Sequence, residues 1–134
     1  MYKNVLVPIA VEHSPNTETQ LKLARTLAGT DGKVTVLTVM EAVPSFIMSE
    51  LPEGQLEHNK AEMRAVLEKL VHGGDVEIDV VTGHAGRTIN AYADEHGIDC
   101  IVIASHQPGL QDYFLGSTAA RVVRHAHCAV HVLR

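Results

Sequence analysis

Strand-like and helix-like segments alternate along the whole chain, and this alternation is what most limits the folds open to it. Five short runs are rich in β-branched and other apolar residues, as strands are. They are residues 2–9, 33–40, 76–81, 99–104 and 128–133. The segments between them include apolar residues at helical spacing, over residues 15–28, 55–71, 87–96 and 117–125. Because strands that alternate with helices are joined by right-handed crossovers, the chain is predicted to form a parallel sheet with helices on both faces.

The connection between the second and third strand-like runs is the longest and has two parts. Residues 41–54 contain two prolines and no clear period, so we expect a connecting loop there. This loop has two interpretations: a lid that places Phe46 and Met48 over a ligand, or a contact with a partner protein. The following segment, residues 55–71, is predicted to be an amphipathic helix with an apolar stripe. The stripe consists of Leu56, Met63, Val66, Leu67 and Leu70.

The composition is that of one globular domain. Of the 134 residues, 46% are hydrophobic and 20% are charged, close to the average of folded soluble domains. The formal net charge of −5 argues against nucleic acid as a partner, since a nucleic-acid-binding face is basic. No apolar run approaches the roughly 20 residues that cross a bilayer, and the first residues do not resemble a signal peptide. We therefore expect a single cytoplasmic domain, 1–134, without membrane insertion, in which Cys100 and Cys128 are buried thiols.

Residues 101–126 contain the strongest candidate for a site. Parallel sheets bind ligands at the carboxyl ends of their strands, where the strand order reverses. The fourth strand is predicted to end at Ala104, and a loop of about ten residues follows before Gly116-Ser117-Thr118 opens a helix. Unpaired N–H groups at a helix start stabilise an anion; Gly116 lets a phosphate approach closely, and the two hydroxyls can donate to its oxygens. The alternative is that Ser117 or Thr118 simply caps the helix.

Five stretches of the chain resemble the universal stress protein family. They are KNVLVPIA, VTVLTVM, VVTGHAGRTI, ASHQPGLQDYFLGS and GSTAARVVRHAHCAVHVLR, and they extend through the whole chain. The loop ASHQPGLQDYFLGS is similar to that of the small F/G-type bacterial members, which share Ser-His-x-Pro and a Tyr before Leu-Gly-Ser. The resemblance implies a three-layer α/β/α sandwich of the adenine nucleotide alpha hydrolase-like kind, with strand order 3-2-1-4-5. It also implies dimer formation through the last strand, with a tetramer or another protein partner left open.

The resemblance further implies that the site binds ATP, with or without Mg²⁺, because many members of the family do so. Their loop has a glycine, two residues, a second glycine, nine residues and then Gly-Ser or Gly-Thr. The last element falls on Gly116 and Ser117, where the triphosphate would lie. This chain departs from the pattern elsewhere: the first glycine falls on Ala104, and the second falls near Gln107 or, after realignment, on Gly109. The loop is also one residue shorter than the pattern.

The walls implied for this site come from the ends of the first two strands. Pro8, Ile9 and Ala10 would offer backbone groups and an apolar surface for the adenine, and Val39 and Met40 would form the opposite side. ATP-binding members typically have an aspartate at the position of Ala10, so an acceptor for the ribose hydroxyls is missing here.

Ser105 and His106 complete the predicted site at the start of the loop. His106 can donate a hydrogen bond as a neutral ring or as a cation. The two residues do not form a nucleophile–base pair, because neighbours at a strand end point in opposite directions. Asp112 is the one acidic residue in the loop, so a magnesium-assisted phosphoryl transfer site is poorly supplied. We therefore expect a nucleotide-binding regulatory module of the stress response. The alternatives are a nucleotide-free dimeric adaptor, or a protein with slow ATPase or autophosphorylating activity.

The histidine-rich stretch HAHCAVH suggests a metal site at first sight. On a strand, however, His127 and His131 share one face and Cys128 lies on the other. Ligands of one metal must converge, and this geometry separates them. We therefore expect no metal there.

Overall fold

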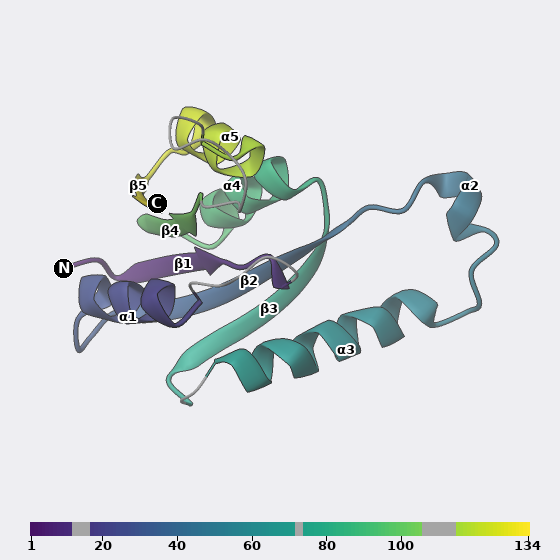
Figure 1. The fold of residues 1–134 in the computed structure, drawn as a ribbon, viewed down its shortest axis with the longest axis horizontal. Coiled ribbons are helices and arrows are strands. Elements are labelled where there is room, and N and C mark those ends of the chain that lie inside the picture. Colours follow the sequence, from purple (N-terminus) through teal and green to yellow (C-terminus); the bar gives the residue numbers. More distant parts are fainter. Residues whose placement is uncertain (12–16, 72–73, 106–114) are drawn as a thin grey trace.

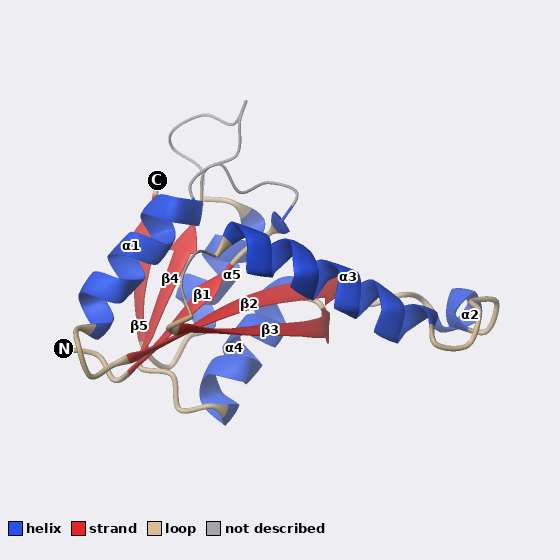
Figure 2. Cartoon of the chain, turned by 90° about the horizontal axis from the view of Figure 1, so that it is seen from below, coloured by secondary structure: helices blue, strands red, loops and turns tan. Residues whose placement is uncertain are grey.

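In the computed structural model, a five-stranded parallel sheet is covered by helices on both faces, as Figure 1 and Figure 2 show. The structure describes residues 1–11, 17–71, 74–105 and 115–134. The strands are β1 (Asn4–Pro8), β2 (Lys33–Glu41), β3 (Val76–Gly83), β4 (Cys100–Ala104) and β5 (Ala129–Leu133). The helices are α1 (Thr17–Ala28), α2 (Ser45–Met48), α3 (Gln55–Leu70), α4 (Ala85–Glu95) and α5 (Ser117–His125). The strand order β3-β2-β1-β4-β5 confirms the fold that the resemblance implied.

Alternation along the strands places neighbouring side chains in two separate cores. Val5 and Val7 pack with α1 and α3, whereas Leu6 between them packs with α4 and α5 on the other face. All three side chains are fully buried. A strand covered on both faces gains from an apolar residue at every position, which explains the unbroken apolar runs in the sequence.

Two predictions about the helices differ from the structure, and a third falls outside the described residues. The segment 41–54, expected to be a loop, contains the short helix α2, whose Ile47 and Met48 amides donate to the carbonyl of Pro44. Helix α4 begins at Ala85, two residues before the predicted start at Arg87. The predicted start of the first helix at Ser14-Pro15 lies outside the described residues, and α1 is described from Thr17.

Helix α3 buries a narrower face than its apolar stripe predicted. Leu67 is fully buried and Met63 is partly buried against the core, but Val66 and Leu70 are 41% and 37% exposed. The helix packs on β3, which is an edge strand, so the sheet covers one side of the stripe. Figure 2 shows the N-terminal half of α3 extending away from the sheet toward α2.

The edge strand β3 is tied to helices on both faces of the sheet. From α3, the Arg64 guanidinium donates to the carbonyl of Ile78 at 2.8 Å. From α4, the Tyr92 hydroxyl donates to the Asp79 carboxylate at 3.0 Å. A side chain that occupies a free carbonyl on an edge strand hinders pairing with another chain.

Candidate functional site

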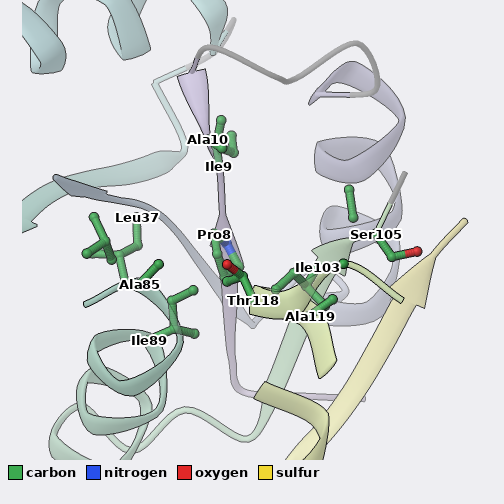
Figure 3. Close-up of a pocket in the computed structure, with 13 residues that line it drawn as sticks. Pro8, Ile9, Ala10, Leu37, Ala85, Ile89, Ile103, Ser105, Thr118 and Ala119 are labelled. Atoms are coloured by element: carbon green, nitrogen blue, oxygen red, sulfur yellow. The ribbon is translucent and has the colours of Figure 1, made fainter. Parts of the chain in front are cut away.

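A cavity of about 160 Å³ opens at the carboxyl ends of β1, β2 and β4, as Figure 3 shows. The first turns of α4 and α5 complete its walls. At this point the chain order reverses, because β1 leads to β2 on one side and β4 leads to β5 on the other. Parallel sheets bind ligands at such points, so the cavity lies where the sequence analysis expected a site.

The structure brings together eight of the twelve residues that the sequence analysis assigned to the site. They are Pro8, Ile9, Ala10, Val39, Ala104, Ser105, Gly116 and Thr118. Of the other four, His106 and Gly109 lie outside the described residues. Met40 and Ser117 are described but do not line the cavity. Strand alternation explains Met40: Val39 packs on the α4–α5 side, where the cavity opens, and Met40 packs on the α1–α3 side.

Five further lining residues were not assigned from the sequence: Leu37, Ala85, Ile89, Ile103 and Ala119. Leu37, in the middle of β2, and Ile103, next to the end of β4, lie on the same face as Val39. Their positions follow from period-two alternation once the face of the cavity is known. Ala85 and Ile89 are one turn apart on α4 and reach the cavity because this helix crosses from β3 to β4 over the sheet. The signal that could have revealed them is the path of α4 over the sheet that the strand order implies.

The polar groups of the cavity gather at the start of α5. The first hydrogen bond of this helix runs from the Ala120 amide to the Gly116 carbonyl at 2.8 Å. The N–H groups of residues 117–119 therefore precede the helical ladder, as the first N–H groups of any helix do. No side chain of the described residues caps α5, so the capping role considered for Ser117 and Thr118 is not what the structure shows.

Ser105 is held in place by the end of β5. Its amide donates to the Leu133 carbonyl at 2.8 Å, and its hydroxyl lies 3.3 Å from the same oxygen. Ser105 is 6% exposed, so its side chain fixes the end of β4 against β5 at the cavity wall. Among the described lining residues none is ionisable, and the cavity wall they form contains no acid or base for catalysis.

The remaining candidates lie away from the cavity. His127 contacts Asp94 on the surface, with 3.1 Å between Nδ1 and a carboxylate oxygen. The described residues hold no group of three or more possible metal ligands. Cys100 and Cys128 are free thiols that belong to opposite cores. Burial raises the pKa of Cys100 to about 11 and also raises the pKa of Cys128.

The segment considered as a lid, residues 41–54, does not contribute to the cavity wall. Figure 1 and Figure 2 show α2 at the far end of α3, well away from the carboxyl ends of β1 and β4. Phe46 is 71% exposed, and no residue of α2 lines the cavity. In this structure α2 therefore does not cover the site.

A doubly wound parallel sheet with a cavity at its switch point defines an α/β domain with a candidate ligand site at the carboxyl edge of its sheet. The chain belongs to the universal stress protein family, whose family model matches residues 1–134. Over 142 residues it is 28% identical to Universal stress protein G of Escherichia coli O157:H7, with both chains covered in full. The solved structure of universal stress protein UspA from Lactobacillus plantarum is 28% identical, with a TM-score of 0.69, and the match covers 99% of this chain and 98% of that one.

Two other solved structures share the fold and hold a nucleotide. One is a universal stress protein in complex with cAMP, with a TM-score of 0.67 and 17% identity over 99% of this chain and 97% of that one. The other is the universal stress protein from Archaeoglobus fulgidus in complex with dAMP, with a TM-score of 0.60 and 21% identity over 99% and 98% of the two chains. At these identities the likeness shows the fold alone. Within the described residues, every helix falls short of the length and apolar character that a bilayer crossing requires.

Proposed function

We propose that this universal stress protein is a regulatory module that binds an adenine nucleotide such as ATP at the carboxyl edge of its sheet and acts as a dimer. The observation that supports the proposal most is the composition of the cavity: an apolar crevice that ends on a helix start that no side chain of the described residues caps. Apolar walls suit the flat face of a base, and the free N–H groups of a helix start suit phosphate oxygens. The complexes of related proteins with cAMP and dAMP indicate that the fold can accommodate such ligands.

Gly116 supports the phosphate end of this proposal. Its φ of −58° is open to any residue, so the backbone does not require glycine there. A Cβ at this position would meet only the Ser105 carbonyl oxygen, at an ordinary 3.8 Å, among the described atoms. Neither conformation nor packing of the described chain explains the glycine. A phosphate that approaches the backbone closely would explain it.

The described residues at the base end are apolar and include no acid. Ile9 and Ala10 form one wall, and Val39 belongs to the other. The cavity of about 160 Å³ is smaller than the roughly 300–1,000 Å³ of sites that enclose a whole drug-sized ligand. We therefore expect the described residues to enclose the base, with the phosphates extending along the start of α5.

Calorimetric titration with ATP, in the presence and absence of Mg²⁺, tests the proposal directly. We expect Gly116→Val and Ser117→Asp to weaken binding at least tenfold, the first by filling the phosphate position and the second by charge repulsion. An acid in the first turn of a helix favours folding, so Ser117→Asp should not lower the melting temperature. Gly74→Val is the matched control, because a Cβ there meets none of the described atoms within 4 Å and the residue does not line the cavity.

Two results would overturn this proposal. If the wild-type protein binds no ATP at millimolar concentration, the nucleotide-free dimeric adaptor remains as the function of this chain. Binding that both substitutions leave unchanged would place the nucleotide elsewhere. Release of inorganic phosphate from bound ATP, followed over hours, would instead indicate the slow ATPase.

Dimer formation is supported by the open edge of β5. This strand pairs with β4 on one side, and Val130 and Val132 are only half-buried. A strand edge with unpaired backbone groups can pair with a second copy of the chain. Light scattering should give the mass of a dimer, and Val132→Lys should convert it to a monomer. A monomeric wild-type protein would contradict this part of the proposal.

A further inference from the structure

The pairing of β1 with β4 stops just before the cavity, and Pro8 is the chemical reason. The register of the two strands ends with Leu6 opposite Ile101. Continued by two residues, it would place residue 8 opposite Ile103, and its N–H would donate to the carbonyl of Val102, as parallel ladders do. Proline has no N–H, so this bond cannot form and the ladder ends. Beyond this point Pro8 and Ile103 line the cavity between the two strands.

Gln20 of α1 satisfies the two carbonyls that the broken ladder leaves behind. Its side-chain nitrogen donates to the carbonyl of Val102 at 2.9 Å and to the carbonyl of Pro8 at 2.9 Å. The side chain is 2% exposed, so both bonds are buried. A primary amide has two N–H groups on one nitrogen, and two carbonyl partners fix which end of the amide lies there.

The residue after β1, Ile9, is hydrogen-bonded to β2 on the other side. The Ile9 amide donates to the Leu37 carbonyl at 2.8 Å, and the Thr38 hydroxyl donates to the Ile9 carbonyl at 2.9 Å. Thr38 is 3% exposed, so this contact is also buried. The chain after Pro8 therefore stays bonded to β2 after its ladder with β4 has ended.

We infer that Pro8 and Gln20 act together to hold the crevice between β1 and β4 open, and that Gln20 is a positioning residue for the ligand. Gln20 comes from α1, on the face opposite the α4–α5 side where the cavity opens, and it does not line the cavity. It acts through the two strands that it bridges. The effect on ligand binding rests on the proposed nucleotide function, whereas the effect on strand pairing does not.

Three variants separate this role from ordinary packing. Gln20→Leu removes both donors and leaves two buried carbonyls unpaired, so we expect a lower melting temperature and weaker ATP binding. Pro8→Ala restores the N–H of residue 8, which can donate to Val102 and extend the ladder. In the double variant Pro8→Ala/Gln20→Leu, the melting temperature should rise above that of Gln20→Leu. Its ATP affinity should stay at least tenfold below wild type, because the crevice has closed.

The decisive result is therefore that the melting temperature rises from Gln20→Leu to the double variant while the ATP affinity does not recover with it. A residue that merely packs would change both in the same direction. Recovery of wild-type ATP affinity in the double variant would overturn the inference.

A second measurement does not depend on the ligand. The backbone amide that Pro8→Ala introduces should be protected from hydrogen exchange in NMR spectra of the double variant, as a ladder amide is. Rapid exchange of this amide would overturn the inference even if ATP binds. Protection of the amide in a protein whose wild type binds no ATP would support the strand-pairing role and reject the nucleotide function alone.

Discussion

Two parts of the β2–β3 connection both carry large apolar side chains, but one part is buried and the other is exposed. Leu67, on the C-terminal half of α3, is fully buried against the sheet. Phe46, on α2 in the same connection, is 71% exposed. Figure 2 shows why: the C-terminal half of α3 lies along β3, and α2 lies beyond the sheet. Helical structure in this connection therefore does not depend on burial everywhere, and we call residues 42–62, which precede the packed half, the arm.

This difference in exposure indicates that the stability of the chain comes from the sheet and the helices packed on it. The contacts that hold α2 are local, such as the hydrogen bond from the Ser49 hydroxyl to the carbonyl of Phe46 at 3.0 Å. Such exposed local bonds contribute little to the free energy of unfolding. Side chains of the packed half, in contrast, contribute through the apolar area they remove from water.

The substitution Leu67→Ala should give the largest effect. It removes a fully buried side chain from the core that α3 shares with β3 and α1. Substitutions of this kind lower the free energy of unfolding by about 2–5 kcal/mol. Urea denaturation followed by circular dichroism measures the change. A loss below about 1 kcal/mol would show that α3 is not docked on the sheet in solution and would remove the distinction between the two parts.

Alkaline pH should lower the stability of the sheet and its packed helices through Tyr92 of α4. Burial, together with the hydrogen bond to Asp79, raises the pKa of Tyr92 from 10.0 to about 12. The folded protein therefore holds this proton more tightly than the unfolded chain. Its contribution to stability is complete below pH 10 and is lost as the pH rises through 12. Cys100, whose pKa burial raises from 9.0 to about 11, adds a loss in the same direction from pH 9 upward.

The measurement is the free energy of unfolding as a function of pH between about 8 and 12. In Tyr92→Phe the decline above pH 10 should be shallower, whatever the stability of the variant at neutral pH. A slope equal to that of the wild type would mean that Tyr92 is solvated and that the contact between β3 and α4 is not closed.

The fold could be predicted from the sequence because the central strands are covered on both faces. Runs such as Val5-Leu6-Val7 require two cores, and alternation with helices leaves a parallel sheet as the solution. Most of the cavity residues at the strand ends and at the start of α5 were predicted, although Ile103 and Ala119 were not. The cavity was missed where it depends on packing: Ala85 and Ile89 reach it through the path of α4 across the sheet.

Two other features could be predicted only from the register of the strands or from how far the sheet extends. Gln20 looks like a polar residue on a helix, and its role appears only when Pro8 is known to face β4 in a particular register. The apolar stripe of α3 indicates a buried face but not how far the covering sheet extends. Val66 and Leu70 are exposed because β3 is the last strand on that side.

Phe46→Ala should give the smallest effect and is the counterpart of Leu67→Ala. Because Phe46 is 71% exposed and belongs to neither core, we expect the free energy of unfolding to change by no more than about 0.5 kcal/mol. The same urea denaturation measures it, at several protein concentrations. A loss of about 2 kcal/mol or more would show that Phe46 is buried in solution. If that loss grows with protein concentration, the covering surface belongs to a second molecule; if it does not, the arm folds back on its own sheet. Either result would end the comparison drawn from Leu67 and Phe46, since the arm would then contribute to stability as the packed half does.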